Sequence, residues 1–136
     1  MKTYHLDTNV VVRFLTHDDP KQWPAAEALM LAARDGKVTL LLDPVVVSEL
    51  TYALDLYFGR GREEIAAALA ALVRSPGIKT ADPGILLDAL KRYGARPVDF
   101  ADALLAARAR ADNVAVASFD RDFDRSEDVE RYEPGR

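Results

Sequence analysis

The feature that most constrains the fold is a regular alternation of short apolar runs with helical patterns along the 136 residues of the chain. The runs that predict strands cover residues 3–6, 38–42, 78–80, 114–118 and 129–132. Helical spacing and cap signals predict helices over 10–15, 25–34, 44–58, 63–73, 83–93 and 99–111. Strands that alternate with helices indicate a parallel sheet covered by helices on both faces. We therefore expect an α/β fold and a single domain over residues 1–136.

Local signals mark several expected element boundaries. Asp43 followed by Pro44 is expected to open a helix, because aspartate favours the cap position and proline the first turn. Gly94 and Asn113 are expected to end the helices that precede them.

Composition excludes several kinds of site. The chain has no cysteine, which excludes disulfides, zinc–thiolate sites and a cysteine nucleophile. This composition suits a reducing compartment, and we expect a cytoplasmic protein. Residues 1–5 contain no apolar signal core, and the longest apolar run, 65–73, is too short to span a bilayer, so no membrane partner is expected. The net charge of −4 argues against a general nucleic-acid coat but is compatible with a nuclease whose cations neutralise its carboxylates.

Two acidic residues stand early in expected strand–helix units. Asp7 follows the first apolar run, and Thr8 and Asn9 begin the helix after it. A carboxylate at the C-terminal end of a strand, just before a helix, lies where open α/β sheets bind ligands. Glu49 lies in the first turns of the helix after the second strand. Taken alone, Glu49 is explained more simply by the favourable placement of negative charge near a helix N-terminus.

Asp99 and Asp102 are separated by three residues, which places both carboxylates on one face of the predicted helix. Asp99 has the position of an N-cap, and this role explains it sufficiently. Asp102 lies among alanine and leucine residues, where a buried carboxylate is costly unless it is paired or bound to a metal. Asp102 is therefore the stronger candidate for a functional acid.

Asp120 and Asp122 follow the run over 114–118, where aspartate is also common as a plain turn residue. Either could be a ligand, and Asp120 is preferred because it is closer to the end of the strand. Acids that gather without cations repel one another and raise each other's pKa. Mg²⁺ or Mn²⁺ resolves this repulsion, and metals held by carboxylates suit phosphoryl chemistry. We expect the distant acids to converge on one such metal site.

In these motifs the chain resembles a PIN-domain ribonuclease, and more narrowly a VapC-type toxin of a toxin–antitoxin pair. The resemblance rests on Leu6-Asp7-Thr8-Asn9-Val10, Arg13-Phe14-Leu15, Ser48-Glu49-Leu50, Asp99-Phe100-Ala101-Asp102-Ala103-Leu104 and Ser118-Phe119-Asp120-Arg121-Asp122-Phe123. It implies a three-layer α/β/α sandwich with a central parallel sheet of four to five strands, in which the first strand is central. It also implies Mg²⁺- or Mn²⁺-dependent endonucleolytic hydrolysis of RNA phosphodiester bonds, leaving a 5′-phosphate.

The resemblance further implies residue roles and partners. The acids carried over as catalytic and metal-binding are Asp7, Glu49, Asp102 and Asp120, with Asp99 and Asp122 as candidate additional ligands. The residues expected to orient them through hydrogen bonds are Thr8, Asn9 and Ser118. The expected partners are an RNA substrate, a VapB-like antitoxin and a second copy of the chain in a homodimer.

Three arginines, Arg13, Arg60 and Arg62, are candidate contacts for RNA phosphates. For Arg60 and Arg62 a solvated loop is an equally good explanation. Two other functions remain open: RNA processing by the same chemistry without an antitoxin, and a non-catalytic RNA- or protein-binding module. A receiver-type or aspartyl-phosphate site is disfavoured, because the first acid is followed by Thr8 and Asn9 and lacks a second aspartate two residues on.

Overall fold

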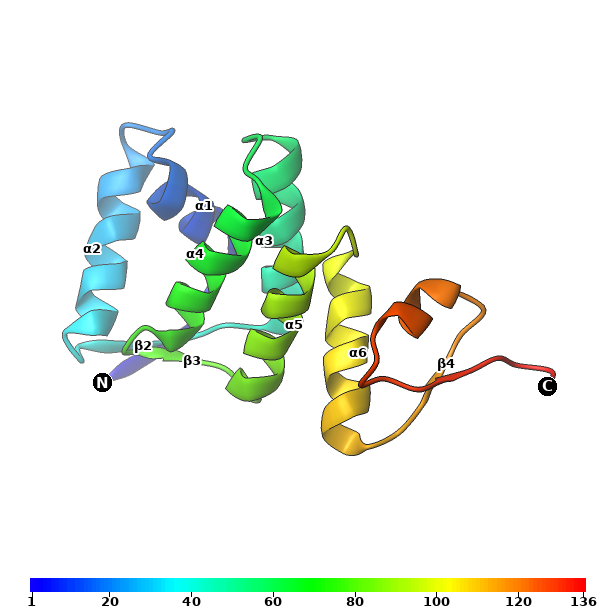
Figure 1. Cartoon of the computed structure of the whole chain (residues 1–136). Helices are drawn as coiled ribbons and strands as arrows, with labels where there is room; N and C mark the ends of the chain where they lie inside the picture. Colours follow the sequence, from blue (N-terminus) through cyan, green and yellow to red (C-terminus); the bar gives the residue numbers. More distant parts are fainter.

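The computed structural model describes every residue from Met1 to Arg136. Figure 1 shows helices and short strands alternating along the chain. The helices are α1 (Thr8–Thr16), α2 (Gln22–Arg34), α3 (Pro44–Leu56), α4 (Arg62–Arg74), α5 (Pro83–Ala95), α6 (Phe100–Asp112) and the 3-10 helix η1 (Arg121–Arg125). The strands are β1 (Lys2–His5), β2 (Val38–Leu41), β3 (Ile78–Lys79), β4 (Val116–Ala117) and β5 (Arg131–Tyr132). This order confirms the predicted α/β fold.

The strands form two parallel sheets. The first sheet has the order β1-β2-β3, and β1 pairs with β2 so that Tyr4 lies opposite Leu40. The second sheet contains only β4 and β5. The parallel α/β architecture is therefore confirmed, with one difference in topology: β1 lies at the edge of its sheet and is not central. The reason is that β4 pairs with β5 alone, so no strand pairs with the outer side of β1.

A main core of 22 buried residues joins the first sheet to the helices around it. Its most deeply buried large side chains include Leu40 of β2, Leu50 of α3, Leu69 of α4 and Leu90 of α5. Each fully buried leucine contributes about 1.5–3 kcal/mol relative to an exposed one. Helices α4, α5 and α6 pack in succession, so α6 is attached to the body mainly through α5.

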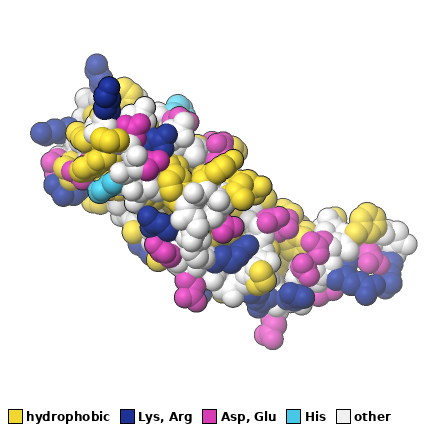
Figure 2. Space-filling model, turned by 90° about the horizontal axis from the view of Figure 1, so that it is seen from above, with side chains coloured by type: hydrophobic (Ala, Val, Ile, Leu, Met, Phe, Trp, Pro, Cys, Tyr) yellow, Lys and Arg dark blue, Asp and Glu magenta, His cyan; other side chains and the backbone are white.

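Residues 114–136, here called the C-terminal arm, extend from one end of an elongated molecule (Figures 1 and 2). Asn113 ends α6, as predicted, in a left-handed conformation with φ 56°. A small separate cluster, Ala106, Val116, Phe123 and Val129, packs the arm against α6. The arm is therefore held by α6, and the main core does not extend into it.

Gly94 does not end α5, which continues to Ala95. A Cβ atom at Gly94 would lie 2.8 Å from the Cβ of Ala66 in α4, closer than two such atoms can approach. Gly94 therefore allows α4 and α5 to pack closely. The prediction that it ends a helix was wrong, because the glycine is needed for this contact between helices.

The substitution Gly94→Ala is expected to lower the free energy of unfolding by about 1–3 kcal/mol, because the new methyl group overlaps Ala66 and forces two helices apart. Gly84→Ala in the same helix is the matched control. A Cβ at Gly84 meets open space, so this change should be neutral or stabilise by up to about 1 kcal/mol. Denaturant unfolding measures both variants, and equal effects would contradict the packing role of Gly94.

Candidate acidic site

Asp7 and Glu49, here called the body pair, are linked through Thr8. Asp7 follows β1 at the N-cap position of α1, and its exposed side chain makes no capping hydrogen bond. The Thr8 hydroxyl donates to Oε2 of Glu49 at 3.2 Å, which connects the start of α1 to α3. Thr8 thus makes the kind of contact that was expected of an orienting residue, whereas the exposed Asn9 hydrogen-bonds neither acid.

Asp99, Asp102, Asp120 and Asp122 form a second group, here called the arm group. Asp102 lies in the first turn of α6 and is partly buried. Burial raises the pKa of Asp102, and the negative charges of the other three acids raise it further. Asp102, Asp120 and Asp122 also line one cavity, although Asp102 comes from α6 and the other two from the arm.

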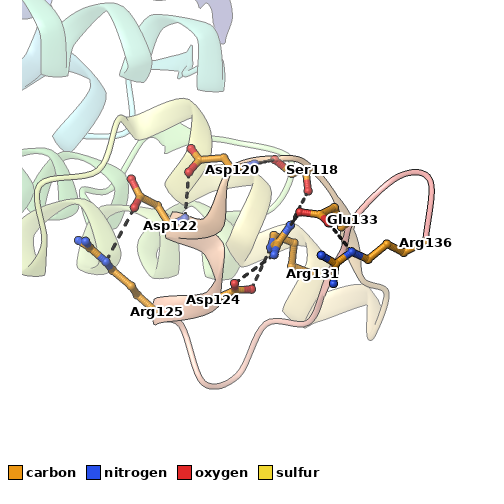
Figure 3. Close-up of polar contacts among 8 residues, drawn as sticks. All are labelled: Ser118, Asp120, Asp122, Asp124, Arg125, Arg131, Glu133 and Arg136. Atoms are coloured by element: carbon orange, nitrogen blue, oxygen red, sulfur yellow. Dashed lines mark hydrogen bonds and ion pairs between the residues drawn. The ribbon is translucent and has the colours of Figure 1, made fainter.

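Ser118 and Asp120 fix the local backbone of the arm group. The backbone N–H of Asp120 donates to Oγ of Ser118 at 3.0 Å, and Oδ1 of Asp120 accepts from the N–H of Asp122 at 2.9 Å, capping η1 (Figure 3). Asp122 instead lies 3.8 Å from the guanidinium of Arg125. Asp120 has no cationic partner, so this difference favours Asp120 over Asp122 as a ligand, and the assignment stays a prediction.

A cavity of about 490 Å³ lies between α5, α6 and η1, and Asp102, Asp120 and Asp122 line it. Basic residues line it too: Lys91, Arg92, Arg96, Arg110 and Arg125. The cavity therefore combines both signs of charge and contains three of the four acids of the arm group, without Asp99 and without the body pair.

The predicted convergence of all the acids in one pocket is not found within a single chain. No three Asp, Glu or His side chains lie close enough together to hold a metal ion. Neither Asp7 nor Glu49 lines the cavity or contributes to the pKa of Asp102. The cause is the division of the sheet, because the arm carries Asp120 and Asp122 beside α6, while Asp7 follows β1 and Glu49 lies in α3. The oxygen ligands suit Mg²⁺ or Mn²⁺, but this arrangement of one chain does not fit such an ion.

The three arginines proposed for RNA contacts all have partners within the chain. Arg13 donates to Gln22 at 2.8 Å and pairs with Asp18 at 3.0 Å, and Arg60 pairs with Glu64 at 2.8 Å. Arg62 is the most strongly engaged, as its Nη1 lies 2.7–3.0 Å from the carbonyl oxygens of three residues: Tyr93, Arg96 and Val98. The expected phosphate contact is therefore not supported for Arg62, because its guanidinium holds the α5–α6 connection.

An ion-pair network in the arm was not foreseen. Arg131, with only 11% of its side chain exposed, donates to both carboxylate oxygens of Asp124 and to the carbonyl of Ser118 (Figure 3). The hydrogen bond from Arg131 lowers the pKa of the Asp124 carboxyl. This network ties β5 to η1 and to the end of β4. No sequence spacing identifies it, because it depends on the arm folding back on itself.

A second network fastens the arm to the body. Asp128 lies 2.6 Å from Arg92 of α5 and 3.1 Å from Arg110 of α6. The hydrogen bond from Arg92, and then the charges of both arginines, lower the pKa of the Asp128 carboxyl. Because the pKa of Asp128 is lower in the folded chain, the contact stabilises the fold at any pH above the unfolded-state pKa of about 3.9. This stabilisation is lost as the pH falls through the folded-state pKa.

We therefore expect the arm to loosen from α5 and α6 when the pH falls below about 4. Amide hydrogen exchange followed by mass spectrometry, with each rate divided by the intrinsic rate at that pH, should show lower protection across residues 114–136 in acid, before the main core opens. The variant Asp128→Asn should exchange faster in the arm at neutral pH as well. Arm exchange in Asp128→Asn equal to that of the unchanged chain at neutral pH would contradict the fastening role.

The fold and the acids together define a parallel α/β protein with carboxylates at strand ends and helix starts. The family model of the PIN domain matches residues 4–128, and the chain belongs to this family, whose members are generally nucleases.

Among solved structures, the chain is similar to one described as VapBC2 from Rickettsia felis bound to a DNA fragment from their promoter. The identity is 18%, the alignment covers 96% of this chain and 97% of the other, and the TM-score is 0.38. The comparison with curated proteins gave no match. No helix in the structure has both the length and the apolar character that crossing a membrane requires.

Proposed function

We propose that the chain is a metal-dependent endoribonuclease that hydrolyses RNA phosphodiester bonds with Mg²⁺ or Mn²⁺. The observation that carries the proposal is membership of the PIN family over residues 4–128, a range that contains all six candidate acids. The two acidic groups support it, because Asp7 and Asp120 follow strands and Asp102 lies in the first turn of a helix. Such positions are where α/β sheets present ligands.

The charge of the acids supports the requirement for a cation. The body pair and the arm group carry only carboxylates, which repel the phosphates of RNA as well as one another. Hard divalent cations bind carboxylate oxygens and offset both repulsions. In the proposed assignment the ligands are Asp7, Glu49, Asp102 and Asp120, with Asp99 and Asp122 as additional candidates. Thr8, Asn9 and Ser118 are proposed to orient these acids.

We further propose that the nuclease acts in the cytoplasm as the toxin of a type II toxin–antitoxin pair. The support is the ordered set of motifs that resembles VapC-type toxins, from the segment around Asp7 to the segment around Asp120. The expected partners are a VapB-like antitoxin and a second copy of the chain. An adjacent short reading frame that encodes a DNA-binding N-terminus would support this role over RNA processing without an antitoxin.

The direct test is to incubate the purified chain with a panel of structured and single-stranded RNAs in the presence of Mg²⁺, Mn²⁺ or a chelator. The proposal predicts internal cleavage that depends on the cation and leaves 5′-phosphates. Binding of RNA without cleavage in any cation would favour the non-catalytic module instead. Cleavage that persists in chelator would contradict the requirement for a metal.

A further inference from the structure

A second hollow, of about 480 Å³, lies where α4, α5 and α6 pack in succession (Figure 1). Three cations line it, one from each helix: Arg74, Lys91 and Arg110. The only acid that lines it is Asp88, and its carboxylate is already paired with Arg92 at 3.1 Å. This space, here called the basic hollow, therefore presents positive charge on a chain whose net charge is −4.

The cations of the basic hollow are available to a ligand. Arg74 and Lys91 are exposed, and neither side chain has an ion-pair partner within the chain. Arg110 is 60% exposed and lies 3.1 Å from Asp128, but Asp128 lies closer, at 2.6 Å, to Arg92. The favourable place of a cation at the end of a helix accounts for Arg74 alone. It does not account for cations of three helices that meet at one hollow.

The other lining residues of the basic hollow are apolar, and none of them is aromatic. They are Ala66, Ala67, Ala70, Leu87 and Leu90. A nucleobase would find no ring here to stack on and few polar groups to read its edges. The charged groups of a nucleic-acid strand, by contrast, are its phosphates, which Arg and Lys contact without reading sequence. The hollow therefore suits the backbone of a strand and not its bases.

The basic hollow continues into the cavity that contains three acids of the arm group. Asp88, Lys91 and Arg110 line both spaces, so the two spaces adjoin. Two more exposed cations, Arg96 and Arg125, line the cavity beside the acids. Positive charge is therefore continuous from the basic hollow to the arm group. A flexible strand that enters the cavity can keep its neighbouring phosphates in the basic hollow.

We propose that the basic hollow binds the phosphates of a single-stranded RNA segment that flanks the bond to be cleaved. A positively charged groove that follows the backbone holds single strands without sequence preference. Arg74 and Lys91 each contact a phosphate, and Arg110 lies where the strand passes into the cavity. That the ligand is RNA rests on the proposed nuclease function, so binding and cleavage are measured separately.

The test is the binding of a short, fluorescein-labelled single-stranded RNA of mixed sequence, followed by fluorescence anisotropy. A chelator keeps the RNA intact, and the concentration of potassium chloride is varied. Each phosphate contact with a single strand contributes about −0.7 to the slope of log K against log salt. The double variant Arg74→Gln/Lys91→Gln should therefore make this slope less steep by about 1.4. Its affinity at about 0.1 M salt should fall by about 25-fold.

Lys37→Gln/Arg108→Gln is the matched control, because it removes the same two charges. Both residues are exposed and lie outside the basic hollow and the cavity. The control should keep the slope of the unchanged chain, and all the chains should unfold at the same temperature. Equal loss of binding in the two double variants would show that net charge alone matters and would overturn the proposal. An unchanged slope in Arg74→Gln/Lys91→Gln would overturn it as well.

A labelled polyglutamate peptide is titrated in parallel, because an acidic protein segment also complements this charge. Peptide binding that is lost in Arg74→Gln/Lys91→Gln while RNA binding is kept would assign the hollow to a protein and overturn the proposal. Loss of RNA binding in that variant of a chain that cleaves no RNA would leave the hollow standing and reject the nuclease. Cation-dependent cleavage by a chain whose RNA binding needs neither Arg74 nor Lys91 would do the reverse.

Discussion

Replacing Asp102 with asparagine is expected to reduce RNA cleavage by at least about 100-fold, more than the loss of an orienting residue causes around a metal site. The amide has the same shape as the carboxylate but lacks its charge. The stability of the folded chain, unlike its activity, should not fall. Burial and the neighbouring acids raise the pKa of Asp102, so its ionised form destabilises the folded chain at neutral pH. The variant should therefore unfold at an equal or higher temperature.

Asp112→Asn is the matched control, because Asp112 is an exposed aspartate at the last turn of the same helix and lies outside the arm group. Initial rates of cleavage of a labelled RNA and thermal unfolding are measured on both variants. Loss of activity together with lowered stability in Asp102→Asn would indicate a structural role and contradict the assignment. Equal activities of the two variants would contradict it as well.

Replacing Arg62 with alanine is expected to lower the free energy of unfolding by about 2–4 kcal/mol, from the loss of charged hydrogen bonds and of a cation–π contact. Its Nη1 serves the carbonyls of Tyr93, Arg96 and Val98, and its guanidinium lies 4.3 Å from the centre of the Tyr93 ring. Removing the side chain leaves partly buried carbonyl groups without a donor, which adds to the cost.

Arg60→Ala tests the same region without this anchoring role. Arg60 makes only an exposed pair with Glu64, four residues along the chain, so its loss should change stability by no more than about 0.5 kcal/mol. Urea unfolding of both variants gives the comparison. If Arg62→Ala were as stable as Arg60→Ala but bound RNA more weakly, the original expectation of a phosphate contact would be correct.

Features that depend on neighbouring residues were predictable from the sequence. Asp43 caps α3 by accepting from the N–H of Val45 at 2.8 Å, with Pro44 in the first turn. Asn113 ends α6 in the left-handed conformation that asparagine tolerates. The order of strands and helices follows from apolar periodicity, and the family follows from the order of the motifs.

Features that depend on distant pairings were not predictable in this way. The pairing of β4 with β5 alone, and the resulting edge position of β1, depend on where the arm packs. Arg62 lies at a helix start beside a loop, which is also a common place for a solvated arginine. Its structural role depends on carbonyl acceptors that lie 31–36 residues further along the chain, and no local pattern indicates them. Gly94 illustrates the same limit, because a glycine that permits helix contact has the sequence signature of a helix stop.

Cation binding tests, without reference to catalysis, whether the body pair and the arm group serve one site. Isothermal titration of the full chain with Mn²⁺ is compared with titrations of Asp7→Asn, Asp120→Asn and the control Asp112→Asn. Asp7→Asn and Asp120→Asn are each expected to weaken the same binding event by at least about tenfold, while the control should not. Mn²⁺ binding that responds to only one of the two groups, or to neither, would contradict a shared site.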